Sequence, residues 1–127
     1  NEEAAGGMEK CILVVDDDMM NLKRTKLILE KQYDLVLAKS GEEALDKLKE
    51  GAIDLILLDI EMPGMSGIET FKRMKEDNVE VPVIFLTASG DEDDVVAAIS
   101  LGAVNYLKKP FLPKELRERI AKELEKE

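Results

Sequence analysis

Residues 55–67 read LILLDIEMPGMSG, and this stretch decides the fold. Four consecutive apolar residues are typical of a strand that is covered on both faces, as in a parallel sheet between helices. Asp59 follows them directly, and Pro63 with Gly64 indicates a turn shortly afterwards. The stretch therefore predicts a buried strand that ends in an acidic residue at the edge of a sheet.

Apolar runs of this kind alternate along the chain with longer stretches of helix-like spacing, which predicts repeated strand–helix units and a parallel sheet. The expected strands are residues 11–15, 34–38, 55–58, 83–86 and 104–107. The expected helices are residues 20–32, 41–50, 66–76, 92–101 and 113–125. Ser40 with Glu43, and Ser66 with Glu69, have the S-x-x-E spacing of capping boxes, which indicates the start of two helices.

The composition is that of one small acidic domain. A length of 127 residues is enough for a single core, and we expect residues 1–8 to be a disordered linker or an expression remnant before a domain over 9–127. A net charge of −10 argues against nucleic-acid binding by this domain, because such binding depends on clustered Lys and Arg. Without a membrane-length apolar run, a signal peptide or more than one cysteine, the chain is expected to be cytoplasmic.

Polar residues follow the expected strands, at the place where open parallel sheets bind their ligands. These residues are Asp16, Asp17, Asp18, Asp59, Thr87, Lys108 and Lys109. Carboxylates that lie close together repel one another, and a hard divalent cation such as Mg²⁺ relieves that repulsion. A cation, an ammonium and a hydroxyl at one edge would share the charge of a transferred phosphoryl group. The chain has no histidine, so another residue type would have to accept that group.

Four segments resemble the signature segments of response-regulator receiver domains and stand in the same order. They are LVVDD at 13–17, LILLDIEMPGMSG at 55–67, VIFLTAS at 83–89 and GAVNYLKKPF at 102–111. The resemblance implies an α/β fold of the flavodoxin-like, doubly wound (βα)5 type, with five parallel strands in the order 2-1-3-4-5. It also implies a module of two-component signalling rather than an enzyme that turns over small substrates.

By the same resemblance, Asp59 is the phosphoacceptor, and Lys109 neutralises charge during transfer. The phosphoryl group would come from a phosphohistidine of a sensor histidine kinase or a histidine phosphotransfer protein. Asp17 would bind Mg²⁺ directly, Asp16 largely through a water, and Glu61 through its backbone carbonyl, with Asp59 completing the metal site. Helix capping is the alternative role for the acidic run at 16–18, and Asp18 is the best candidate for it.

The resemblance also implies how the domain would switch. Thr87 would hydrogen-bond the phosphoryl group, and Tyr106 would turn inward after it. The surface of the fourth helix, fifth strand and fifth helix would then change toward a downstream effector domain or protein, and a homodimer could form there. The residues alone would predict an ordinary strand threonine and a half-buried tyrosine. The bond from Lys109 to Pro110 is expected to be cis.

Glu61 and Ser89 stand two positions beyond Asp59 and Thr87. We expect these two side chains to tune the lifetime of the phosphorylated form. Two other functions are compatible with parts of the sequence. Asp16-x-Asp18 after the first strand also fits an aspartate-nucleophile phosphatase of the haloacid-dehalogenase type, although Asp59 would then have no role. A receiver-like interaction module that works without phosphorylation is the other alternative.

Overall fold

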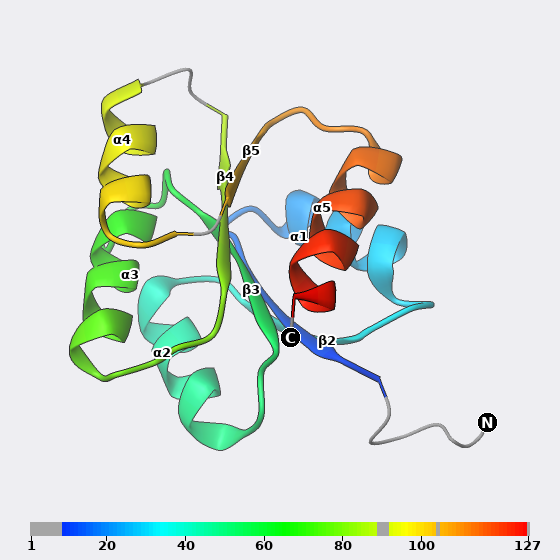
Figure 1. Ribbon diagram of the computed structural model, residues 1–127, viewed down its shortest axis with the longest axis horizontal. Coiled ribbons are helices and arrows are strands. Elements are labelled where there is room, and N and C mark those ends of the chain that lie inside the picture. Colours follow the sequence, from blue (N-terminus) through cyan, green and yellow to red (C-terminus); the bar gives the residue numbers. More distant parts are fainter. Residues whose placement is uncertain (1–8, 89–91, 104, 127) are drawn as a thin grey trace.

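One parallel sheet of five strands, in the order β2-β1-β3-β4-β5, forms the centre of the computed structural model (Figure 1), which describes residues 9–88, 92–103 and 105–126. The strands are β1 (Cys11–Val15), β2 (Asp34–Ala38), β3 (Leu55–Asp59), β4 (Val83–Thr87) and β5 (Asn105–Lys108). The helices are α1 (Met19–Leu29), α2 (Gly41–Glu50), α3 (Gly67–Glu76), α4 (Glu92–Ser100) and α5 (Pro113–Glu125). The predicted fold class and strand order are confirmed.

The element boundaries agree closely with those expected from the sequence. The bounds of β1, β2, α2 and α5 are the predicted ones, and β3 and β4 each extend one residue further. The predicted fifth strand began at Val104, which lies outside the described residues, and the observed strand ends one residue later, at Lys108. Helix α1 ends at Leu29 rather than at the predicted residue 32, because the N–H groups of Gln32 and Tyr33 both turn back to the Leu29 carbonyl.

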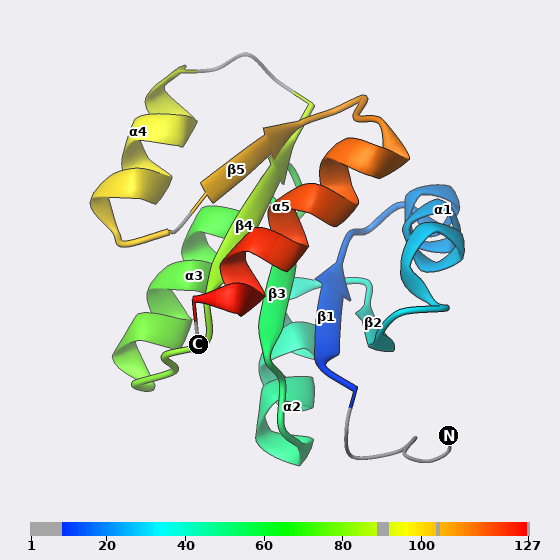
Figure 2. The same ribbon diagram turned by 45° about the vertical axis from the view of Figure 1, so that its right-hand side comes forward.

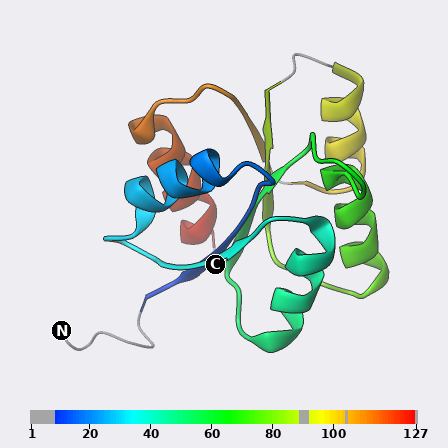
Figure 3. The ribbon, with the colours of Figure 1, turned by 180° about the vertical axis from the view of Figure 1, so that it is seen from behind.

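Helices cover both faces of the sheet. Helices α1 and α5 lie on one face, and α2, α3 and α4 lie on the other (Figures 1 and 2). The view from behind shows the same two layers of helices with the sheet between them (Figure 3). Alternate residues of each strand therefore enter two separate cores, as Leu13 and Ile12 of β1 do. This burial on both faces explains the unbroken apolar runs of β1, β3 and β4.

The larger core residues fill both layers. Under α2, α3 and α4, the rings of Phe71 and Phe85 meet edge to face with centroids 5.3 Å apart. Under α1 and α5, Leu22, Leu116 and Ile120 pack on the other face of the sheet. No helix in the described part of the chain is both long and apolar enough to cross a membrane.

The registers of the strands bring their carboxyl ends to one edge in step. Val15 pairs with Leu58, Asp59 pairs with Leu86, and Thr87 pairs with Lys108. Residues that follow β1, β3, β4 and β5 therefore meet at a single edge of the sheet. Backbone pairing therefore brings the polar residues predicted to share a site to this edge.

Caps fix the starts of three helices. Ser66 and Glu69 form the predicted reciprocal capping box at the start of α3. At α2, the Ser40 hydroxyl accepts from the Glu43 N–H, but the Glu43 carboxylate accepts from the Lys39 N–H at 3.1 Å. The second capping box is therefore half right: the cap is present, but the return bond reaches one residue further back. Asp18 caps α1 by accepting from the Met20 N–H at 2.8 Å, as predicted for it.

Candidate functional site

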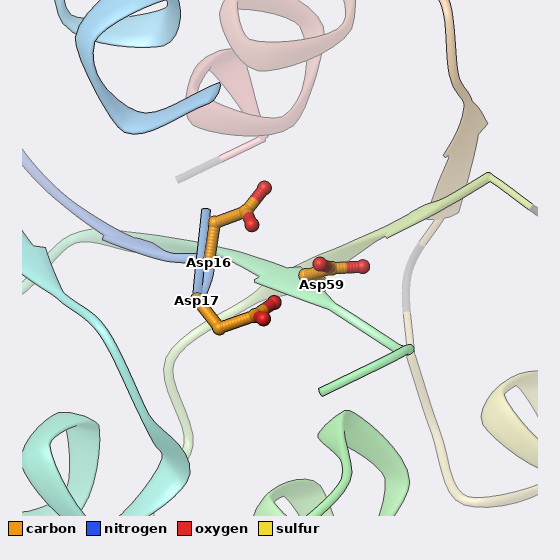
Figure 4. Close-up of side chains that lie close together, drawn as sticks. All are labelled: Asp16, Asp17 and Asp59. Carbon is orange, nitrogen blue, oxygen red and sulfur yellow. The ribbon is translucent and has the colours of Figure 1, made fainter. Parts of the chain in front are cut away.

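Three carboxylates converge at the carboxyl edge of the sheet. Asp16 and Asp17 follow β1, Asp59 ends β3, and one oxygen of each lies within 4.8 Å of the others. Figure 4 shows the three side chains pointing toward a common space. We call Asp16, Asp17 and Asp59 the acidic cluster. Asp16 and Asp59 are buried, whereas Asp17 is exposed, so the cluster is open to solvent on one side.

A single ammonium lies against the two buried carboxylates. Lys109 Nζ is 2.9 Å from Asp16 Oδ2 and 3.3 Å from Asp59 Oδ2. Lys109 follows β5, and its N–H donates to the Thr87 carbonyl at 2.8 Å, which fixes the backbone beside β4. The peptide bond from Lys109 to Pro110 is cis, as predicted. Lys108 is exposed, so the choice of Lys109 as the site lysine agrees with the geometry.

Burial and like charges set the protonation behaviour of this edge. Burial is the largest cause that raises the pKa of Asp59 to about 7; the Lys109 charge opposes it, and the charges of Asp16 and Glu61 add to it. Burial lowers the pKa of Lys109, but the hydrogen bond to Asp16 and the charge of Asp59 outweigh it, so the net shift is upward. The site therefore holds more negative charge than its one ammonium can neutralise.

The three consecutive aspartates of residues 16–18 make different contacts. Asp16 uses Oδ2 for Lys109 and Oδ1 to accept the Asp18 N–H at 2.9 Å. Asp17 contributes its oxygen to the acidic cluster from the exposed side. Asp18 is used as the cap of α1. The assignment of the first two to the cluster and the third to capping agrees with the sequence-based expectation.

Glu61 makes contacts that the sequence did not indicate. Its N–H donates to Asp59 Oδ1 at 3.2 Å, and its carboxylate crosses to the end of β4. There Glu61 Oε2 accepts from the Thr87 hydroxyl at 2.9 Å, and Oε1 accepts from the Ala88 N–H at 3.0 Å. The sequence predicts that Glu61 tunes the lifetime of the phosphorylated form, but it indicates no partner for the Glu61 carboxylate. No spacing in the sequence signals its contact with Thr87, which depends on the β3–β4 register.

Tyr106 and Ser89 are the two other residues predicted to act at this site. Tyr106 is 40% exposed on β5, and its carbonyl accepts from Arg119 Nη1 at 2.7 Å. Its side chain is thus at the surface in this structure. Ser89 lies outside the described residues, and so the expectation for it has no structural counterpart here.

A cavity of about 370 Å³ adjoins the acidic cluster on the side of α1. The residues that line it include Asp16, Lys109, Arg24 and Phe111. The Arg24 guanidinium lies 5.3 Å from the centre of the Phe111 ring and donates to the Phe111 carbonyl at 3.0 Å. Sequence reasoning missed both residues, because they meet only when α1 and the segment after β5 come together. The cavity leaves space beside the carboxylates for a group brought by another molecule.

Comparisons with known proteins agree with this geometry. The family model described as the response regulator receiver domain matches residues 12–121. The transcriptional regulatory protein CpxR of Escherichia coli strain K12 is 46% identical over 110 residues, which are 86% of this chain and 47% of that protein. The alkaline phosphatase synthesis transcriptional regulatory protein PhoP of Bacillus subtilis strain 168 is 40% identical over 114 residues, 89% of this chain and 48% of that protein.

A solved structure extends the likeness to the whole fold. The response regulator receiver domain protein (CheY-like) of Methanospirillum hungatei JF-1 superposes with a TM-score of 0.88 and 33% identity. The superposition covers 93% of this chain and 95% of that one. By contrast, the chain spans about half the length of the two transcriptional regulators that it matches.

Proposed function

The chain belongs to the response regulator receiver domain family, and from this premise we propose that it accepts a phosphoryl group on Asp59 from a phosphohistidine of a partner protein. As a receiver domain of a two-component response regulator it is a signalling domain rather than a turnover enzyme. We propose that the receiver unit spans residues 9–127. The donor would be a sensor histidine kinase or a histidine phosphotransfer protein.

The observation that carries this proposal is the position of Asp59 between an ammonium and two further carboxylates. Its carboxylate ends a central strand, contacts Lys109 Nζ at 3.3 Å and lies within the acidic cluster. A nucleophilic carboxylate needs its attacking oxygen directed outward and the charge of the incoming group neutralised. The Lys109 ammonium supplies the neutralising charge at the edge of the sheet, next to Asp59 Oδ2.

The transfer step follows from these contacts. One Asp59 oxygen attacks phosphorus in line with the P–N bond of the phosphohistidine; the new P–O bond forms as the P–N bond breaks, and the imidazole leaves with its electron pair. The Lys109 ammonium, next to Asp59 Oδ2, stabilises the charge on the moving phosphoryl oxygens.

The acidic cluster fits Mg²⁺. Three carboxylate oxygens within 4.8 Å of one another, one from an exposed side chain, form the hard oxygen donor set that this cation prefers. We propose Asp17 and Asp59 as direct ligands, Asp16 as a ligand acting largely through water, and the Glu61 carbonyl as a further ligand. When bound, the cation supplies positive charge that stabilises the phosphoryl oxygens and orients them for transfer.

We propose that Thr87 and Tyr106 report phosphorylation to the surface of α4, β5 and α5. Thr87 ends β4 with its hydroxyl at the site, and Tyr106 lies on the neighbouring strand. Apolar side chains are exposed on this surface, with Val96 at 60% and Ile99 at 49%. A shift between two packings of this surface would change its affinity for an effector or for a second copy of the chain.

We also propose that Glu61 and Ser89 tune the lifetime of the phosphorylated form. The support is the position of Glu61, whose N–H contacts the phosphoacceptor and whose carboxylate contacts Thr87. The dephosphorylation rates of Glu61→Asn and Ser89→Ala should differ from that of the wild type. Equal rates in both variants would contradict this role.

The output that this receiver domain controls is suggested by its relatives. CpxR and PhoP are transcriptional regulators, and this chain corresponds to about half of each. We propose that the receiver controls a downstream effector domain or protein, with nucleic-acid contacts, where there are any, made outside these acidic residues. A cytoplasmic location would suit that role.

A mass measurement tests the proposed phosphorylation. The protein is incubated with a small phosphodonor such as acetyl phosphate and Mg²⁺, and the intact mass is recorded. Wild type should gain one phosphoryl group, Asp59→Asn should gain none, and Asp46→Asn, a matched change on the exposed side of α2, should behave as wild type. The same result in wild type and Asp59→Asn would overturn the proposal.

The two alternatives predict other outcomes. A phosphatase of the haloacid-dehalogenase type would use Asp18 as a catalytic acid or base, but Asp18 is occupied by capping α1. Turnover of phosphate esters by the purified protein would favour that alternative. A phosphorylation-independent module would gain no mass at all. The structural support for both is weaker than that for Asp59, which lies in the site with a neutralising lysine.

A further inference from the structure

The carboxylate of Glu61 is held at the end of β4 by two hydrogen bonds. The donors are the Thr87 hydroxyl, at 2.9 Å from Oε2, and the Ala88 N–H, at 3.0 Å from Oε1. Each donor is bound by a different oxygen of the same charged group. The carboxylate therefore binds the pair of donors as a bidentate anion.

These two donors face the space next to the phosphoacceptor. Thr87 is the last residue of β4, and Asp59 is the last residue of the adjacent strand β3. A phosphoryl group on Asp59 carries three strong acceptor oxygens and nearly two negative charges. Its oxygens would accept hydrogen bonds from the same hydroxyl and amide that now donate to Glu61. This step rests on the proposed function, which places the phosphoryl group on Asp59.

We propose that Glu61 is a tethered competitor of the phosphoryl group: in the unmodified domain its carboxylate binds the Thr87 and Ala88 donors, and phosphorylation must displace it. Glu61 thereby sets the affinity of the site for phosphoryl-like anions. The event at Thr87 is an exchange of one anionic acceptor for another.

The local structure favours both the contact and its release. Asp59 Oδ1 accepts the Glu61 N–H at 3.2 Å, which directs the short turn after β3 and keeps the side chain within reach of β4. Glu61 itself is exposed, so its carboxylate can move into water without crossing the core. A phosphoryl dianion on Asp59 repels the Glu61 carboxylate, and its oxygens carry more negative charge for the Thr87 and Ala88 donors than that carboxylate does. Displacement is therefore favourable once the new anion is held by Asp59.

The contact reduces apparent affinity in a way that can be measured. If the site is open in only a fraction of molecules, the apparent dissociation constant of an anion rises by the inverse of that fraction. A contact closed in about nine molecules of ten weakens binding about tenfold. Removing the contact should recover this factor, whereas a change of charge elsewhere should not.

Beryllium fluoride with Mg²⁺ is a suitable probe, because it mimics a phosphoryl group on a carboxylate without forming a stable ester. Three variants at one position separate contact from charge. Glu61→Ala removes both, Glu61→Gln removes the charge, and Glu61→Asp keeps the charge but is one methylene shorter, so that it cannot reach both donors. Glu80→Gln, a matched loss of charge at an exposed residue before β4, is the control.

The expected result is that Glu61→Ala and Glu61→Asp both bind beryllium fluoride about tenfold more tightly than wild type, while Glu80→Gln binds as wild type. Wild-type affinity in Glu61→Asp with tighter binding in Glu61→Gln would show simple repulsion and overturn the competitor role. Wild-type affinity in all three Glu61 variants would overturn it as well. The proposed function fails in a different pattern, in which Asp59→Asn binds the probe as well as wild type does.

A second measurement needs no bound anion. The amide proton of Ala88 donates to a carboxylate in the unmodified domain, so its NMR signal should lie downfield. Glu61→Ala and Glu61→Asp should move that signal upfield, and beryllium fluoride should change it in wild type as the partner is exchanged. An Ala88 signal that is the same in wild type and Glu61→Ala would overturn the proposed contact.

Discussion

Lys109 is the residue that joins three strands at the site. It follows β5, yet its ammonium contacts Asp16 after β1 and Asp59 at the end of β3. In the strand order β2-β1-β3-β4-β5 these three strands are not all neighbours. The long, flexible side chain of Lys109 therefore crosses the end of β4 to reach the two carboxylates. A shorter residue at this position would leave the buried Asp16 and Asp59 without the ammonium.

Cys11 lies at the opposite end of β1 and responds to its acidic neighbours. Its side chain is partly exposed. Burial is the main cause that raises the pKa of its thiol, and the charges of Asp34 and Asp54 add to it. We therefore predict that Asp34→Asn lowers this pKa and speeds alkylation by iodoacetamide about twofold to threefold at mildly alkaline pH, because the thiolate is the reacting form.

The pH–rate profile of alkylation, followed by mass, checks this prediction. The profile of Asp34→Asn should move to lower pH, and the two rates should converge where the thiol is fully ionised. Asp46→Asn, with the same loss of charge on the exposed side of α2, should follow wild type. Asp54 is a poorer test, because its Oδ2 also accepts the Cys11 N–H at 2.8 Å. A profile unchanged by Asp34→Asn would exclude the electrostatic effect.

At the residue scale, the sequence predicted which side chains share the edge, but not all of their partners. Strand ends and the doubly wound topology bring Asp16, Asp59 and Lys109 together; the strand ends follow from the sequence pattern, whereas the strand order followed from the resemblance to receiver domains. The contact from Glu61 to Thr87 depends on one side-chain rotamer and on the β3–β4 register, which pairs Asp59 with Leu86. Neither has a local sequence signal.

At the scale of elements, the loop from β3 to α3 is packed with almost no space to spare. A Cβ at Gly67 would overlap the carbonyl oxygen of Asp59 and lie 2.8 Å from Ile60 Cα. Both are backbone atoms, which cannot move without shifting the end of β3. We predict that Gly67→Ala lowers the free energy of unfolding by about 1 to 3 kcal/mol, as overpacking does. Urea denaturation measures the change.

The matched control for this substitution is Gly51→Ala. Gly51 has an extended backbone, with φ −168°, and a Cβ there would have no neighbour within 4 Å. Its free energy of unfolding should stay within about 0.5 kcal/mol of wild type. Equal stability of the two alanine variants would show that the loop after Asp59 adapts freely.

The cap of α3 allows a second prediction for this element. Ser66 accepts from the Glu69 N–H, and Glu69 returns a bond to the Ser66 N–H. Ser66→Ala removes one partner of this pair, so the free energy of unfolding should fall by about 1 kcal/mol. Thermal or urea unfolding checks it, with Ser100→Ala on the exposed end of α4 as control. A loss of the same size in the control would rule out the capping explanation.

Helix starts were predictable where a serine cap precedes them. The Ser40 cap placed the start of α2 to the residue, and the Ser66 cap placed the start of α3 to within one residue. The end of α1 was placed too late, because the amphipathic spacing continues past Leu29 while the backbone already turns there. Periodicity shows which face of a helix is buried; it does not show where tertiary contacts end the helix.

For the molecule as a whole, the acidic cluster couples stability to pH. The pKa of Asp59 is raised to about 7, above the value near 3.9 of an unfolded chain. The folded state therefore holds this proton more tightly, and stability is lost as pH rises from about 4 to about 7. The loss is on the order of a few kcal/mol, since one pKa unit corresponds to about 1.4 kcal/mol.

We predict that, in a chelator, the melting temperature of the wild type falls more steeply between about pH 4 and about pH 7 than that of Asp59→Asn. Adding Mg²⁺ should raise the wild-type melting temperature more at the upper pH, where the carboxylate is charged and can bind the cation. Calorimetry at several pH values measures both effects. Parallel curves for the two proteins would contradict the raised pKa.

The two ends of the described part of the chain lie on the same side of the molecule, away from the carboxylates. Strand β1 begins and helix α5 ends at the amino edge of the sheet (Figures 1 and 2). A fluorescent label, an affinity handle or a sensor chip coupled beyond Lys10 or Lys126 would therefore leave the opposite rim facing the solution. The domain can therefore be attached through the amino edge of the sheet while the carboxyl edge stays accessible to binding partners.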